Sequence, residues 1–169
     1  MKRIVVTLVT LLAVTASGAA RAADTIDGTP GPDKIPGTPG ADVITAKAGD
    51  DVVHAKAGDD LVLGGPGADT IHGQRGSDEL RGDAGADVVD AGRDPQKDYV
   101  IGGGGNDKLY LRGRDNGYGG PGDDRVWSTY AQAGAKVRCG GGHDVLIFNQ
   151  PSPAVVRYGC EVVKIVSAG

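Results

Sequence analysis

The sequence predicts an all-β protein in which short parallel strands stack into a solenoid, and three observations support this prediction. An aspartate recurs every nine residues from Asp33 to Asp87. A glycine stands two residues before each of these aspartates, and an aliphatic residue stands two residues after each. Glycine makes up 30 of the 169 residues, which is typical of some disordered chains, but disordered chains lack aliphatic residues in so regular a register.

The repeat begins with uninterrupted nonads over residues 28–90, which read GTPGPDKIP, GTPGADVIT, AKAGDDVVH, AKAGDDLVL, GGPGADTIH, GQRGSDELR and GDAGADVVD. The register then changes. RDPQKDYVI at 93–101 follows two residues late, GGGGNDKLY at 102–110 restores the motif, and the stretch 111–118 is one residue short. GGPGDDRVW at 119–127 is another close copy, and CGGGHDVLI at 139–147 follows a longer insertion.

Each nonad divides into a turn and a strand. The fourth-position glycine suits a turn with positive φ, which other residues adopt only at a cost. The last three positions suit a very short strand, whose middle aliphatic side chain points inward while its neighbours point outward. The aliphatic residues of successive nonads should therefore stack into one narrow core.

The nonads resemble the RTX, or haemolysin-type, calcium-binding repeat G-G-x-G-x-D-x-U-x, in which U is a large aliphatic residue. The resemblance covers residues 28–147. It implies a right-handed parallel β-roll (a β-solenoid) with two nonads per turn and several Ca²⁺ ions between the turns. Each strand would then pair with the strand 18 residues along. The second glycine is replaced in several units, and Lys47 and Lys56 predict weaker calcium sites there.

The sixth-position aspartates are the predicted calcium ligands. A reversing loop leaves carbonyl groups without partners, and Ca²⁺ binds about six to eight carboxylate and carbonyl oxygens. We expect Asp33 and Asp51 to face one ion at one edge, and Asp42 and Asp60 another at the opposite edge. In the alternative, the aspartates only cap loop amides, but carboxylates stacked about 5 Å apart would repel one another. The predicted ligands are Asp33, Asp42, Asp51, Asp60, Asp69, Asp78, Asp87, Asp107, Asp124 and Asp144.

Residues 1–22 have the pattern of a secretion signal. A basic pair precedes the apolar run 4–16, and an Ala-Arg-Ala cleavage site follows, so we expect a secreted chain that begins at Ala23. The alternative is a membrane anchor, but a span needs about 20 apolar residues. Removal would take three basic residues and no acid, changing the formal net charge from −4 to −7. Such a chain is a poor candidate for nucleic-acid binding and a good one for metal cations.

Residues 23–127 are predicted to form the roll, and residues 128–169 the last repeat and a C-terminal cap. An even number of cysteines in an exported chain favours a disulfide between Cys139 and Cys160, although two free thiols are the alternative. Cys139 opens the last nonad, so the bridge would tie the cap to the roll. Closing such a loop would add about 3 kcal/mol of stability.

The predicted function is that of a secreted calcium-binding protein without catalytic activity. The sequence contains neither H-E-x-x-H nor G-x-S-x-G. Calcium binding is expected to drive folding outside the cell. One alternative is an extracellular structural or adhesive module with a cell-surface or matrix partner, in which calcium is only structural. Another is an RTX-bearing enzyme that modifies polysaccharides.

His54 and His72 stand at the ninth position of their nonads, 18 residues apart. Two imidazoles on neighbouring strands could bind Zn²⁺ or respond to pH. The interpretation that we favour is an exposed histidine pair.

Overall fold

A computed structural model describes residues 23–130, 132, 134–149 and 156–165. The predicted secretion signal at 1–22 lies outside these residues. The described part of the chain forms β-strands linked by turns, and it contains no helix that could cross a membrane.

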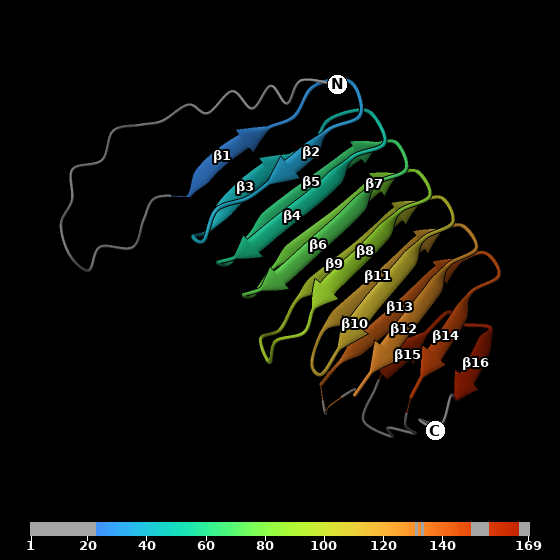
Figure 1. The fold of residues 1–169 in the computed structure, drawn as a ribbon. Coiled ribbons are helices and arrows are strands. Elements are labelled where there is room, and N and C mark those ends of the chain that lie inside the picture. The colour runs from blue at the N-terminus through green and yellow to red at the C-terminus, as the bar shows by residue number, and fades with distance from the viewer. Residues whose placement is uncertain (1–22, 131, 133, 150–155, 166–169) are drawn as a thin grey trace.

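Successive strands alternate between two parallel sheets of eight strands each. Within each sheet the strands follow one another along the axis of the roll (Figure 1). The first sheet contains, in spatial order, β1 (Asp24–Asp27), β3 (Asp42–Thr45), β5 (Leu61–Pro66), β7 (Glu79–Ala84), β9 (Tyr99–Gly104), β11 (Asn116–Pro121), β13 (Lys136–Gly141) and β15 (Val156–Tyr158). The second contains β2 (Lys34–Pro36), β4 (Val52–Ala57), β6 (Thr70–Arg75), β8 (Val88–Gly92), β10 (Lys108–Arg112), β12 (Arg125–Thr129), β14 (Val145–Phe148) and β16 (Val162–Ile165). The predicted parallel β-roll is confirmed.

The pairing register follows the nonads. Val43 pairs with Leu61, one turn of 18 residues away. Where the sequence register changes, the spacing between paired strands changes with it: Glu79 pairs with Tyr99, and Tyr99 pairs with Asn116. Extra or missing residues are therefore absorbed in the loops, and the strands stay aligned.

Several strands are longer than the three residues predicted. β4 and β5 each have six residues, because they continue into the first positions of the next nonad. The first-position side chain also points inward, as the full burial of Ala46 and Ala55 shows. The inward-outward alternation of a strand thus continues for two residues beyond the aliphatic position.

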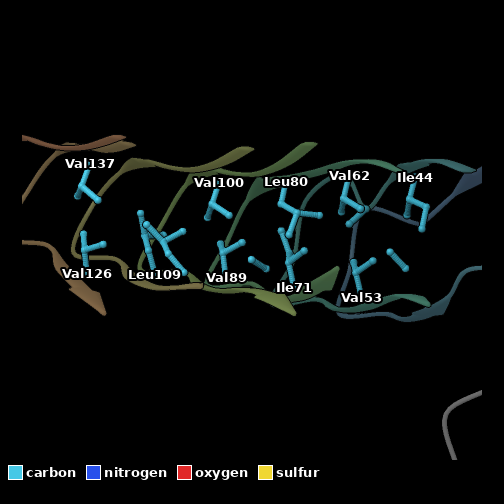
Figure 2. Packing of buried hydrophobic residues seen from close by; sticks show 14 of the residues in the cluster. Ile44, Val53, Val62, Ile71, Leu80, Val89, Val100, Leu109, Val126 and Val137 are labelled. Atoms are coloured by element: carbon cyan, nitrogen blue, oxygen red, sulfur yellow. The ribbon is translucent and has the colours of Figure 1, made fainter. Parts of the chain in front are cut away.

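The core consists of two facing rows of eighth-position side chains (Figure 2). Ile44, Val62 and Leu80 come from the first sheet, and Val53 and Ile71 from the second; all are fully buried. Complete burial of one such side chain contributes about 1.5–3 kcal/mol. The core is only two side chains thick, so the stability of the roll is the sum of small contributions from each turn.

Gly117 occupies a core position and provides no side chain. A Cβ atom at Gly117 would collide with Leu111 Cδ1, and Leu111 is itself buried in the core. Leu111 comes from the stretch that is one residue short. Its side chain therefore fills the space that an eighth-position aliphatic residue fills in the other nonads.

Strands β13 and β14 continue the two sheets, since they pair in register with β11 and β12. The predicted disulfide is present between Cys139 and Cys160, whose Cα atoms are 5.1 Å apart. Cys139 is buried in β13, so the bridge ties the core to the chain just before β16. The division into a roll at 23–127 and a cap at 128–169 stays a prediction.

Replacing Gln74 by glycine should stabilise the protein. Gln74 stands at the second position of its nonad with φ of 77°, where the family pattern has glycine. Removing this backbone strain should raise the free energy of unfolding by about 0.5–1 kcal/mol, the net of strain relief and greater freedom in the unfolded chain. Urea denaturation of the folded protein measures the change.

Thr38→Gly is the matched control at the same position of an earlier nonad. Thr38 is not among the residues with positive φ, and its hydroxyl donates to Asp42 Oδ1 at 2.9 Å. Its replacement should therefore lower the free energy of unfolding, by about 1 kcal/mol. A change of the same sign in both variants would contradict this account of the loops.

Candidate metal centre

The sixth-position aspartates form two columns, one along each edge of the roll, where each loop leads into a strand. The first column, at the start of the second sheet's strands, contains Asp33, Asp51, Asp69, Asp87, Asp107, Asp124 and Asp144. The second column, at the start of the first sheet's strands, contains Asp42, Asp60, Asp78, Asp98 and Asp115. The two pairs expected from the sequence, Asp33 with Asp51 and Asp42 with Asp60, are thus neighbours in these columns.

One hydrogen bond links each aspartate to the next in its column. The backbone N–H of Asp51 donates to Asp69 Oδ1 at 2.9 Å, and that of Asp69 donates to Asp87 Oδ1 at 2.8 Å. The amide-capping role considered as the alternative is therefore real. In eight of the aspartates it uses only one of the two carboxylate oxygens.

The second carboxylate oxygen has no hydrogen-bond partner in most members of the columns. This oxygen, Oδ2, is buried and unpartnered in Asp51, Asp60, Asp69, Asp78, Asp87, Asp107, Asp124 and Asp144. An unpaired buried anion is costly, and proteins ordinarily pair such a group with a cation. All eight aspartates are among the ligands predicted from the sequence.

Burial raises the pKa of these carboxyl groups. The pKa of Asp78, Asp87 and Asp124 is raised to about 7, mainly by desolvation. The negative charges of column neighbours raise it further, and the hydrogen bond from the preceding turn partly opposes the shift. Ionised columns at neutral pH are therefore destabilising unless a cation balances them.

A glycine brings a backbone carbonyl close to the free carboxylate oxygen. A methyl group at Gly64 would lie 2.5 Å from Asp69 Oδ2 and 2.6 Å from the carbonyl oxygen of Gly82. The two oxygens therefore face one space, no further apart than the sum of these distances. The same arrangement is found beside Gly73, with Asp78 and the carbonyl of Ala91. Carboxylate and carbonyl oxygens together form the donor set that Ca²⁺ prefers, so these residues fit the ion.

Within the described ranges, no group of three or more His, Cys, Asp or Glu side chains could hold a metal ion. The columns explain this result, because two successive turns bring only two carboxylates toward the space between them. Further oxygens would have to come from the backbone, as the carbonyls of Gly82 and Ala91 illustrate.

Asp33 and Asp42 differ from the other predicted ligands, because their own loops satisfy them. Asp33 Oδ2 accepts hydrogen bonds from the Thr29 backbone N–H at 2.5 Å and from its hydroxyl at 2.9 Å. The Thr38 backbone N–H donates to Asp42 Oδ2, and the Thr38 hydroxyl donates to Asp42 Oδ1. A cation at these loops would compete with bonds already made, so we expect weaker sites there. Calcium ligation by these two residues stays a prediction.

Asp98 and Asp115 belong to the second column but are missing from the predicted ligands. Asp98-Tyr99-Val100 keeps the Asp-x-aliphatic signature, which could have identified Asp98 despite the shifted register. Asp115 is followed by Asn116-Gly117 and has no such signature. Burial raises the pKa of Asp98 to about 8. Asp115 Oδ2 accepts a hydrogen bond from the Arg112 backbone N–H at 2.7 Å.

His54 and His72 form a stacked pair on the outside of the second sheet. Their ring centroids are 4.8 Å apart, and the rings are nearly parallel. His72 Nδ1 lies 4.0 Å from Asp90 Oδ2, and Gln74 Nε2 lies 3.4 Å from His54 Nδ1. His54 is exposed and His72 is partly buried; whether the pair binds a metal ion stays untested.

A family model described as RTX calcium-binding nonapeptide repeat matches the chain in four copies, at residues 21–52, 36–71, 63–95 and 96–113. These copies span more than half of the chain and include most members of both columns. A comparison with curated proteins finds no match.

Asp69→Asn should change stability in opposite directions with and without calcium. Asparagine keeps an oxygen that can accept the Asp51 N–H but removes a buried negative charge. In chelator the free energy of unfolding should therefore rise. In calcium it should fall, and the Ca²⁺ concentration at the folding midpoint should rise about tenfold, or about 1.4 kcal/mol. Urea denaturation in both conditions measures the effect.

Asp33→Asn is the control, because Thr29 already satisfies the carboxylate oxygen that stays free in Asp69. It should leave the calcium midpoint within about twofold of wild type. Equal shifts for the two variants, or a loss of stability in chelator for Asp69→Asn, would contradict the role given to the free oxygens.

In chelator, the free energy of unfolding should fall as the pH rises from about 4 to about 8. The pKa of Asp78, Asp87 and Asp124 is about 7 in the folded chain, whereas an unfolded aspartate titrates near its ordinary pKa of about 3.9. The folded state therefore binds more protons over this interval. The stability so gained is present below the unfolded pKa and is lost as the pH rises through the folded pKa.

Calcium should flatten or reverse this pH dependence, because metal-binding carboxylates must be deprotonated. Urea denaturation at a series of pH values, with chelator and with calcium, tests both trends. Stability that increases with pH in chelator would show that the columns are not desolvated as described.

Proposed function

The chain belongs to the family of RTX calcium-binding nonapeptide repeats, and from this premise we propose that it is a secreted protein whose β-roll is folded and stabilised by Ca²⁺ bound along the aspartate columns, without catalytic activity of its own. The repeats bind several Ca²⁺ ions. The observation that supports the assignment of the ligands is the buried, unpartnered Oδ2 atom shared by eight aspartates.

The strongest candidate ligands lie in the middle of the roll. Asp69 and Asp87 are neighbours in the first column, and Asp60 and Asp78 in the second; in each pair a free oxygen is presented from both turns. When bound, Ca²⁺ supplies the positive charge that balances these carboxylates. The aspartates meanwhile keep the hydrogen bonds that link successive turns.

The unfolded chain does not hold these carboxylates together, so calcium binding is coupled to folding. Carboxylates from turns 18 residues apart become neighbours only after the sheets form. Binding free energy therefore becomes folding free energy. Without a balancing cation, repulsion along each column opposes the same sheets. The protein is proposed to be loosely folded at low calcium and fully folded at high calcium.

Secretion is supported by the pattern of residues 1–22 and by the disulfide between Cys139 and Cys160. Disulfides persist mainly in oxidising compartments outside the cytoplasm. Calcium-dependent folding suits the same location, since extracellular modules bind calcium with dissociation constants of about 0.1–1 mM. A protein built in this way would complete its folding after export.

The proposal includes no catalytic role. The carboxylates best placed to act as acids or bases are those of the columns, where each is hydrogen-bonded to the next turn and proposed to balance a cation. A turnover of uronate polymers that is lost on mutation of acids outside the columns would overturn this part of the proposal.

Asp60→Ala should bind fewer Ca²⁺ ions than wild type, because it removes one free carboxylate oxygen from the second column. Native mass spectrometry of residues 23–169 across a calcium titration counts the bound ions. Asp90→Ala is the control, since Asp90 lies outside the columns and its side chain is partly exposed. It should bind as many ions as wild type; equal losses in both variants would contradict the ligand assignment.

Export should produce a mature chain that begins at Ala23. Expression in a secreting bacterial host, followed by N-terminal sequencing of the protein in the medium, tests this cleavage. A chain retained at the membrane with residues 1–22 attached would contradict the proposed secretion.

A further inference from the structure

An open groove lies on the outside of the roll, where β4, β6 and β8 meet the turns of the second aspartate column. Its walls include Lys56, Arg75 and Arg93, together with His72 and Gln74. We call it the basic groove. The assignment of the calcium ligands makes no use of these side chains.

The three cations of the basic groove lie on successive turns. Ala57, which follows Lys56, pairs with Arg75 across the parallel sheet, and Arg93 stands one turn further along. All three side chains are exposed. Among the described residues, none of the three has an acid within ion-pair distance. A row of unpaired cations in a chain of net charge −4 indicates a surface suited to an anion.

The two acids in the groove are already engaged. Asp94 Oδ2 accepts a hydrogen bond from the Gly76 backbone N–H at 2.6 Å. Asp90 Oδ1 accepts one from the Gly92 N–H at 3.2 Å, and its other oxygen lies near His72. The groups that remain for a ligand are therefore chiefly donors, from the cations and from Gln74.

We propose that the basic groove binds the phosphate group of a phosphate-bearing ligand, and that it does so when the adjacent aspartate column carries calcium. The guanidinium groups of Arg75 and Arg93 have the planar fork that binds phosphate oxygens in a bidentate manner. A phosphate monoester has three strong acceptor oxygens, so it can contact all three cations, whereas a carboxylate has only two oxygens. The calcium dependence rests on the proposed function.

The groove and the second column interact electrostatically. Asp94 lines the groove, and its carboxylate accepts the hydrogen bond from Gly76, two residues before Asp78 of the column. Without a cation, ionised carboxylates on this edge repel an incoming phosphate. Each bound Ca²⁺ adds two positive charges, so four ions outweigh the formal net charge of −7 that the chain carries without residues 1–22.

Isothermal titration calorimetry with glycerol 3-phosphate tests the site, with the same saturating calcium concentration in cell and syringe. The double variant Arg75→Gln/Arg93→Gln should weaken binding at least tenfold. Arg81→Gln is the control, because Arg81 lies on β7 of the opposite sheet and pairs with Glu79. It should leave the affinity unchanged, and circular dichroism and a calcium titration establish that both variants fold and bind calcium.

Glycerate, the corresponding carboxylate, should bind more weakly than glycerol 3-phosphate. A short poly(glycerol phosphate) distinguishes the two sources of the phosphate group. Tighter binding of the polymer, lost in the same double variant, indicates a phosphodiester polymer, and tighter binding of the monoester indicates a small phosphorylated molecule. Either result supports the proposal.

The proposal is overturned if the calcium-loaded protein does not bind glycerol 3-phosphate, or if the double variant and Arg81→Gln bind equally well. Equal binding in chelator and in calcium would overturn the calcium dependence. Failure of the proposed function has a different signature, since the calcium titration of the wild type would then show no bound ions at all.

Discussion

Buried carboxylates stacked one turn apart are the interaction on which the rest of this structure depends. Each column places aspartates on successive turns, uses one oxygen of each to cap the preceding turn, and leaves the other buried without a partner in most units. Desolvation and mutual repulsion make the columns unfavourable by themselves. Cations along the columns would offset both costs, and this is the basis of the proposed calcium-dependent folding.

The fold follows from the need to present these carboxylates at a fixed interval. Nine residues allow one turn and one strand, and two such units return the chain to the same edge. The resulting core is only two side chains thick, as the facing rows of Ile44 and Val53 illustrate. A thin core contributes little stability per turn, so in the proposed function cation binding supplies a large share of the stability. At the C-terminal end, the disulfide of Cys139 adds a covalent restraint.

Much of this architecture could be predicted from the sequence, because the nonad determines the turn, the strand and the inward aliphatic residue together. The pattern did not predict the local interactions that depart from it. Asp115 joins its column although Gly117 stands in the core position, because Leu111 fills the gap from outside the register. Thr29 makes Asp33 a loop cap, a competition that periodicity alone does not reveal. The basic groove also escaped prediction, because its cations come from three different turns of the roll and share no fixed position in the nonad.

The most direct test of the central claim is a far-UV circular dichroism titration of residues 23–169 with Ca²⁺, with Mg²⁺ as the control. Mg²⁺ demands a tighter octahedral geometry and gives up its water reluctantly, so it should substitute poorly in loops of carbonyls and carboxylates. The account predicts a partial β signal in chelator, a cooperative gain with Ca²⁺ and little change with Mg²⁺. A complete β signal in chelator that Ca²⁺ leaves unchanged would show that the glycine turns and the core fold the roll without help from the columns.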